Sequence, residues 1–138
     1  MGQGRIKCIV RNKWVAMTPE ELVRQGVLTF LIDQLHYPKG RFVVEKVVKV
    51  NGMNKRADAI IHDTEGRPQM VIECKRKDSP LDQRTVAQIA MYNRSLDAPY
   101  LLLTNGEDAH ILHISMESDS ISTLRTIPNY EELMNHAV

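Results

Sequence analysis

Residues 57–75 read ADAIIHDTEGRPQMVIECK, in which two apolar, β-branched runs are separated by a polar segment. The runs 57–62 and 69–75 have the composition of strands, and the polar residues between them favour the loop of a β-hairpin. Because side chains alternate along a strand, Glu73 and Lys75 share one face of the second run. The sequence therefore predicts a hairpin that carries a carboxylate and an ammonium group side by side.

The register of this hairpin decides what lies opposite Glu73. A turn centred between Glu65 and Gly66 places Asp58 directly across from it, with the two Cβ atoms roughly 4.5–5.5 Å apart. Two carboxylates in that position repel each other, and a bound divalent cation would neutralise them and use their oxygens as ligands. A one-residue slip would turn Asp58 to the opposite face and leave Glu73 and Lys75 as an ion pair on a solvated sheet face.

Magnesium suits such a site better than zinc, because the candidate ligands are hard carboxylate oxygens. We expect Mn²⁺ to substitute for Mg²⁺. A metal held by Asp58 and Glu73 can lower the pKa of a bound water and stabilise charge on a phosphoryl oxygen during in-line attack. Lys75 would either orient the attacking water or stabilise the transition state electrostatically, and the sequence does not choose between these roles.

A helix is predicted from Thr18 to about His36, since Thr18 can cap it and Pro19 suits its first position. Its apolar residues recur at helical spacing. Glu20 lies on the same side of this helix as several of them, so we expect it to lean over the sheet as a third carboxylate, with Glu21 as the alternative. Either side chain could instead serve only to stabilise the positive end of the helix dipole.

The rest of the chain continues as a succession of strand and helix signals. Predicted strands cover 42–50, 100–104, 109–114 and 121–127, and predicted helices cover 82 to about 96 and 129–136. This order indicates an α/β fold with a central mixed β-sheet flanked by α-helices. A chain of 138 residues is about one domain long, so we expect a single domain over 1–138.

The predicted second helix offers Gln88 and Tyr92, which are four residues apart and therefore share one face. The simpler interpretation is an ordinary packed helix face. Beside the hairpin, however, Gln88 could donate a hydrogen bond to a phosphate or to Glu73.

Net charge is close to neutral, with 18 Lys and Arg against 17 Asp and Glu. Any nucleic-acid site must therefore come from local clusters of basic residues, because phosphate neutralisation dominates non-specific affinity. The candidate contacts are Lys55, Arg56, Arg76 and Arg84, and a solvated charged surface is the alternative interpretation.

Several classes of protein are disfavoured by what the sequence lacks. Cys8 and Cys74 have no metal-binding spacing, so reduced thiols are expected rather than a zinc site or a disulfide framework. No apolar run approaches the ~20 residues needed to span a bilayer, and no signal peptide is recognisable, so we expect a cytoplasmic protein. Dinucleotide-binding and nucleophile-elbow motifs are missing, and His62, His110 and His113 are interpreted as strand residues.

Asp58 followed by Glu73-Cys74-Lys75 resembles the D…(D/E)xK signature of PD-(D/E)XK nucleases. Over residues 18–112 the sequence resembles, more specifically, the N-terminal nuclease domain of type I restriction enzyme R subunits. The resemblance rests on an ordered series of segments. These are Thr18 to Gln25, Tyr37-Pro38, Lys55 to Asp58, Val71 to Lys75, Gln88 with Tyr92, and Leu103 to Gly106.

The resemblance implies a restriction-endonuclease-like fold with a central mixed sheet. It also implies metal ligation by Asp58, Glu73 and Glu20, catalysis by Lys75, and a helix motif of Gln88 and Tyr92 beside the site. Ala57 stands where the signature has Pro, which removes no ligand. Nothing resembles a GxxxxGK[ST] phosphate loop, so the translocase activity of R subunits is not carried over.

The leading hypothesis is an Mg²⁺-dependent endonuclease that hydrolyses DNA phosphodiester bonds. The alternative is a non-catalytic nucleic-acid-binding or assembly module on the same fold. Domains of this size in the superfamily often act as dimers, so the resemblance implies a homodimer, although the sequence specifies no dimer face. RNA as a substrate and a partner subunit stay open.

Overall fold

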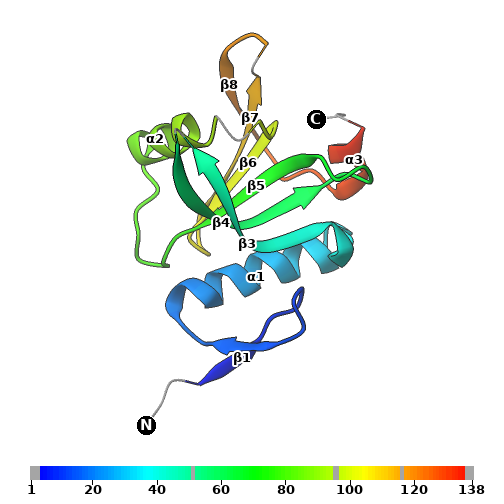
Figure 1. Ribbon diagram of the computed structural model, residues 1–138. Helices are drawn as coiled ribbons and strands as arrows, with labels where there is room; N and C mark the ends of the chain where they lie inside the picture. Colours follow the sequence, from blue (N-terminus) through cyan, green and yellow to red (C-terminus); the bar gives the residue numbers. More distant parts are fainter. Residues whose placement is uncertain (1–3, 51, 95–96, 116, 136–138) are drawn as a thin grey trace.

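The computed structural model of the chain describes residues 4–50, 52–94, 97–115 and 117–135. Figure 1 shows a twisted β-sheet with helix α1 (Pro19–Asp33) below it and helix α2 (Gln83–Asn93) on its other side. The strands of the sheet are β3 (Phe42–Val50), β4 (Met53–His62), β5 (Pro68–Cys74), β6 (Tyr100–Thr104), β7 (Ala109–Ser115) and β8 (Ser120–Leu124). The remaining elements are strands β1 (Arg5–Lys7) and β2 (Trp14–Ala16), the 3₁₀ helix η1 (Lys39–Arg41) and helix α3 (Tyr130–Met134).

The six strands are hydrogen-bonded in the order β3-β4-β5-β6-β7-β8. β5 and β6 are parallel and are connected through α2, whereas the other neighbours in the sheet pair antiparallel. The prediction of an α/β domain with a mixed sheet flanked by helices is therefore confirmed. β1 and β2 form a separate two-stranded sheet that adds to the predicted elements. β8 and α3 are shorter than predicted, and the predicted end of the last helix, 136, lies outside the described residues.

The hairpin of β4 and β5 has the predicted register. Ala59 pairs with Ile72, and the next pairs toward the turn, at 60 with 71 and 61 with 70, follow the same register. The turn is stabilised by Asp63, whose Oδ1 accepts hydrogen bonds from two backbone N–H groups of the loop, each at 2.9 Å. Gly66 has φ of +82°, a conformation that L-residues with a side chain rarely adopt. A register shift at His62 is confined to the turn end of the hairpin, and the pairs from 61 with 70 to 59 with 72 keep the predicted register. The predicted pair of Asp58 with Glu73 lies beyond the last paired residues.

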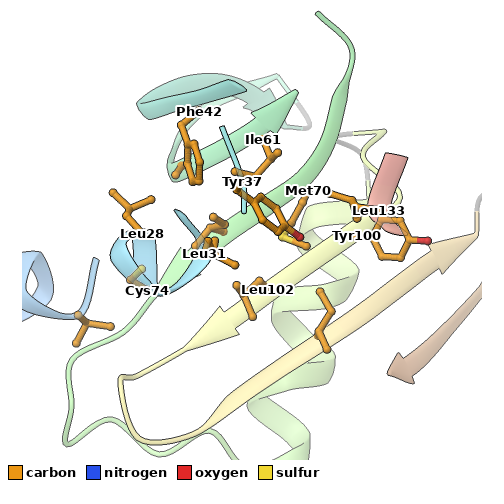
Figure 2. Packing of buried hydrophobic residues seen from close by; sticks show 14 residues of the cluster. Leu28, Leu31, Tyr37, Phe42, Ile61, Met70, Cys74, Tyr100, Leu102 and Leu133 are labelled. Atoms are coloured by element: carbon orange, nitrogen blue, oxygen red, sulfur yellow. The ribbon is translucent and has the colours of Figure 1, made fainter. Parts of the chain in front are cut away.

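Helix α1 begins as predicted. Thr18 Oγ1 accepts a hydrogen bond from Glu21 N at 3.1 Å, and Pro19 follows at a position whose N–H needs no helical partner. Leu28 and Leu31 of this helix are fully buried and belong to the main core. Figure 2 shows that core, to which Leu28, Leu31, Tyr37, Phe42, Ile61, Met70, Cys74, Tyr100, Leu102 and Leu133 contribute.

Helix α2 covers the opposite face of the sheet. Its N-cap is Asp82, whose Oδ1 accepts a hydrogen bond from Thr85 N at 2.8 Å. A second core cluster on this side contains Ala57, Ile60, Val71, Ala90 and Leu101. Along β5, Val71 thus belongs to the α2 side and Ile72 to the α1 side, as strand alternation requires.

The two cysteines are buried and free, and Cys74 packs into the α1-side core. His62 lies in β4, and His110 and His113 lie in β7, which confirms their interpretation as strand residues. No helix in the described part of the chain is long and apolar enough to cross a membrane.

Candidate active site

The hydrogen-bonded ladder between β4 and β5 stops just before the two acidic residues of interest. Its last backbone pair is Ala59 with Ile72. Beyond that pair, Asp58 Oδ2 accepts a hydrogen bond from the backbone N–H of Cys74 at 2.7 Å. The point at which β4 and β5 separate, marked by Asp58, Glu73 and Cys74, is called the fork below. A carboxylate, rather than a backbone carbonyl, closes the ladder there.

Lys75 follows the fork at the end of β5. Its N–H donates to Thr104 O at 2.8 Å, so the chain leaves β4 and continues along β6. The residue is partly exposed, and its positive charge opposes the rise that burial causes in the pKa of Asp58. Lys75 therefore lies within electrostatic range of Asp58, which the predicted catalytic role requires.

Asp58 occupies surroundings that disfavour its ionised form. Burial raises the pKa of this carboxyl above its ordinary value, and the negative charge of Glu73 raises it further. The hydrogen bond from Cys74 N and the charges of Arg24 and Lys75 act in the opposite direction without cancelling the rise. Arg24 Nη2 lies 3.4 Å from Asp58 Oδ1. An additional cation at the fork would stabilise the ionised carboxylate.

Glu73 is buried, with 5% of the residue exposed, and its charge is compensated by Lys55. Lys55 Nζ lies 2.7 Å from Glu73 Oε1, within ion-pair distance. This contact is an ion pair, and among the described residues Oε1 accepts no hydrogen bond. Lys55 Nζ also donates to Asn93 Oδ1 of α2 at 3.0 Å, and Asn93 Nδ2 donates to Ile89 O at 2.9 Å. The lysine is thus held between the fork and α2.

A second group of charges lies between the fork and α1. Arg24 Nη1 is 3.0 Å from Glu45 Oε1 and 3.7 Å from Glu21 Oε1. Arg11 Nη1 is 3.1 Å from Glu45 Oε2, and Arg11 Nη2 is 3.7 Å from Glu21 Oε1. The neighbouring guanidinium of Arg24 lowers the pKa of Glu45 despite partial burial. Arg24 therefore connects Asp58 to two further carboxylates.

The carboxylate that α1 brings toward this group is Glu21, and the expectation that Glu20 leans over the sheet is wrong. Glu21 is buried and accepts a hydrogen bond from Gln25 Nε2 at 2.8 Å, whereas Glu20 is exposed. The buried stripe of the helix runs through Glu21, Arg24, Gln25 and Leu28 at helical spacing. Glu20 is one residue earlier, which rotates it by about 100° away from that stripe.

The remaining predicted site residues are not gathered at the fork. Gln88 is exposed on α2, and in the part of the chain that the structure describes no hydrogen bond joins it to Glu73. The side chain of Tyr92 lies outside the described part. Arg56 and Arg84 are exposed, and Arg76 forms an exposed ion pair with Asp78 at 3.6 Å. From α2, the residue that reaches the fork is Asn93, through Lys55.

The sequence holds weak signals for the residues that these predictions miss. Glu45 is a single acidic residue among the valines of β3, and it has φ of +58°, in the left-handed region. Arg24 lies on the buried stripe of α1, where a charge needs a partner. A charged residue at such a position, in a helix or in an apolar strand, indicates an ion pair inside the protein. The sequence alone does not show that Arg24 and Glu45 are partners.

The fork fits a magnesium ion by the chemistry of its donors. Asp58 and Glu73 supply hard oxygens, and Mg²⁺ is often bound by one or two carboxylates while it keeps several waters. Glu73 Oε1 accepts no hydrogen bond among the described residues and already faces one cation, Lys55, at 2.7 Å, so the atom lies in surroundings that suit positive charge. In the described residues, no group of three or more His, Cys, Asp or Glu side chains converges closely enough to hold a metal. A metal here would therefore depend on two carboxylates and on water.

Comparisons with known proteins relate this fold to restriction enzymes. The family model of the type I restriction enzyme R protein N terminus (HSDR_N) matches residues 19–128. A solved fragment described as an HsdR subunit of a type I restriction enzyme from Vibrio vulnificus YJ016 aligns with a TM-score of 0.54 and 23% identity. A chain of the DrdV-DNA complex aligns with a TM-score of 0.52 and 14% identity. At these identities the two structures show a shared fold.

These relatives are much longer than the present chain. The alignments cover 80% and 86% of this chain but only 23% and 12% of the HsdR and DrdV chains, respectively. No curated protein matches the sequence. The family model nevertheless spans most of the 138 residues, including both strands of the fork. The chain therefore belongs to the family of type I restriction enzyme R protein N termini.

Proposed function

We propose that this chain is a metal-dependent nuclease of the PD-(D/E)XK type that hydrolyses DNA phosphodiester bonds. The observation that carries the proposal is the pair of carboxylates at the fork. Asp58 has a pKa raised by burial and by the charge of Glu73. Glu73 Oε1 is buried and accepts no hydrogen bond from the described residues, although Lys55 Nζ lies 2.7 Å away. A divalent cation between the two carboxylates would relieve the repulsion and would coordinate carboxylate oxygens that the protein compensates with the ion pairs of Arg24 and Lys55.

Magnesium is the proposed metal, with Mn²⁺ as a substitute, and it would supply an activated water and charge stabilisation at the phosphoryl group. Asp58 and Glu73 would hold it. Lys75 would stabilise the negative charge that develops on the phosphate oxygens, because its ammonium group is close enough to influence Asp58. Arg24 would orient the carboxylate of Asp58, because it forms ion pairs with both Asp58 and Glu45.

DNA is the proposed substrate because the family consists of restriction enzyme R protein N termini and one structural neighbour comes from a DNA complex. Since the chain spans less than a quarter of those neighbours, the proposal covers hydrolysis alone and leaves out translocation and assembly. A homodimer in which each site cuts one strand would produce double-strand breaks. The expected place of action is the cytoplasm.

The test is nicking of supercoiled plasmid with Mg²⁺ or Mn²⁺. Wild type should nick the plasmid, whereas Asp58→Asn, Glu73→Gln and Lys75→Ala should each lose at least about 10²-fold of the rate, the size expected for a central electrostatic group. Glu65→Gln is the matched control, because Glu65 is an exposed carboxylate at the far end of the same hairpin. Nicking that survives all three fork substitutions would refute the assignment.

A non-catalytic nucleic-acid-binding or assembly module is the second candidate. It is favoured by the ion pairs of Arg24 with Asp58 and Lys55 with Glu73, which already compensate the two carboxylates within the protein. Calorimetry with Mn²⁺ separates the two functions. Binding that Asp58→Asn removes would support the nuclease even where a partner is needed for cleavage, and absence of binding would support the module.

A further inference from the structure

Beyond the fork, β3 and β4 continue as a two-stranded ribbon. We use this name for residues 46–50 and 53–57, whose pairs run from 46 with 57 to 50 with 53. The ribbon ends beside α2 (Figure 1), where Lys55 Nζ donates to Asn93 Oδ1 at 3.0 Å. Ala57 is fully buried on the same side. One face of the ribbon is thus turned toward α2, and the other is open.

The open face of the ribbon consists of Val47, Lys49, Asn54 and Arg56. Val47 lies across from Arg56, and Lys49 lies across from Asn54, so the four side chains form two adjacent cross-strand pairs. All four residues are exposed, and Val47 is 54% exposed although it is apolar. The face therefore presents one apolar group, one amide and two cations to solvent in a compact arrangement.

Charge is distributed unevenly between the ribbon and the rest of the chain. Residues 46–57 contain four basic and no acidic residues. Because the whole chain has 18 basic and 17 acidic residues, the part outside this segment is net acidic. Among the described residues, neither Lys49 nor Arg56 forms an ion pair with a carboxylate. The charge of Arg56 nevertheless helps to lower the pKa of Glu45. The ribbon is thus complementary to a polyanion.

We propose that the open face of the ribbon enters the major groove of duplex DNA and positions the duplex at the fork. This inference rests on the proposed function only in taking DNA as the substrate. A two-stranded ribbon fits the B-form major groove, which is about 12 Å wide. Arg56 can donate to guanine, Asn54 can pair with adenine, and Val47 can contact a thymine methyl group, while Lys49 reaches a phosphate.

The position of the ribbon relative to the fork agrees with this docking. Arg56 and Asp58 are two residues apart on β4, which corresponds to about 7 Å along a strand. A ribbon centred in the major groove lies about 6 Å from the flanking sugar-phosphate backbone, half the groove width. The base of the ribbon would therefore meet the backbone near Asp58. Duplex RNA offers no such fit, because its major groove is deep and narrow.

Binding is measured by fluorescence anisotropy with a 20-base-pair duplex in EDTA, so that no cleavage takes part. Lys49→Gln/Arg56→Gln should weaken binding roughly 50-fold at 0.1 M salt. The slope of log K against log salt should become less steep by about 1, because only Lys49 of the two is placed on a phosphate. Lys39→Gln/Arg125→Gln is the matched control, because it removes two exposed cations outside the ribbon. The control should bind like wild type.

Two further probes test the groove rather than the charge. Wild type should bind duplex DNA at least about tenfold more tightly than duplex RNA of the same sequence, because side chains do not reach the RNA bases through its major groove. Methylation of guanine N7, which lies in the major groove, should inhibit binding. Any of three results would overturn the proposal. These are equal affinity for the DNA and RNA duplexes, affinity unchanged by N7 methylation, and equal losses of affinity in the ribbon variant and its control.

The outcome is separable from that of the proposed function. Ribbon-dependent binding of duplex DNA by a protein that never cleaves would uphold the ribbon and reject the nuclease. Metal-dependent cleavage that the ribbon variant retains at wild-type kcat/KM would uphold the nuclease and reject the ribbon. Circular dichroism and thermal unfolding of the variant confirm that the exposed substitutions leave the fold intact.

Discussion

Replacing Lys55 by Met should destabilise the protein strongly when no metal is present. Lys55 Nζ lies 2.7 Å from Glu73 Oε1, and the two side chains are 17% and 7% exposed, respectively. Loss of the cation leaves a buried carboxylate without its counter-ion, a change that costs about 3–5 kcal/mol in buried pairs. Asn93 Oδ1 loses its donor as well. For a domain of this size, the corresponding fall in Tm is roughly 10–20 °C.

The assay is urea unfolding in EDTA, followed by circular dichroism. Lys39→Met, at an exposed lysine, is the matched control and should stay within about 0.5 kcal/mol of wild type. Adding Glu73→Gln to Lys55→Met should restore most of the lost stability, because the uncompensated charge is then absent. A Lys55→Met variant as stable as wild type, or a double variant no more stable than the single one, would refute the pairing of Lys55 with Glu73.

Magnesium provides an independent measurement on the same variants. If the fork binds Mg²⁺, the ion should stabilise Lys55→Met more than wild type, because it replaces the lost positive charge. A ligand at 100 times its Kd stabilises a protein by about 2.7 kcal/mol. Equal stabilisation of both proteins, or none, would show that the ion does not act at Glu73.

Two other predictions concern Asp58 and the first turn of α1. Without metal at pH 7, Asp58→Asn should be more stable than wild type, because a raised carboxyl pKa means that the ionised form opposes folding. The difference in unfolding free energy between the two proteins should shrink as the pH falls through the raised pKa, and it should vanish below the ordinary value of 3.8. Urea unfolding between pH 7 and pH 3 would measure it. A difference that grows on acidification would contradict the prediction. Glu21→Gln should cost about 1–3 kcal/mol in thermal unfolding, whereas Glu20→Gln should stay within about 0.5 kcal/mol, and equal losses would contradict the helix phase described above.

The fold was largely accessible from sequence because its strands and helices have strong periodicity and clear turn residues. The hairpin register followed from one turn, since the position of Gly66 between two apolar runs fixes every pair up to Ala59 and Ile72. The short strands β1 and β2 carried no comparable signal, because three residues do not establish an alternation. The sequence pattern thus predicted those helices and strands that are long enough to show a regular spacing of apolar residues.

The candidate site was less accessible, because its electrostatics depend on contacts between distant residues. The sequence offers Lys55 as a candidate nucleic-acid contact, yet it is held against Glu73 and Asn93, which lie 18 and 38 residues further along the chain. Glu21 and Glu20 are adjacent, and only the packing of α1 on the sheet decides which one is buried. Whether Asp58, Glu73 and Lys75 carry out catalysis stays a prediction that the proposed cleavage assay tests.

The hydrogen bond from Cys74 N to Asp58 Oδ2 makes a side chain of the candidate site the final acceptor of the β4–β5 ladder. Protonation of Asp58, or its use as a metal ligand, would change the strength of that acceptor. The exchange rate and chemical shift of the Cys74 amide proton should therefore follow the state of the carboxylate directly. A single backbone amide would in this way act as a spectroscopic reporter of proton or metal binding, readable by NMR in the absence of any nucleic acid.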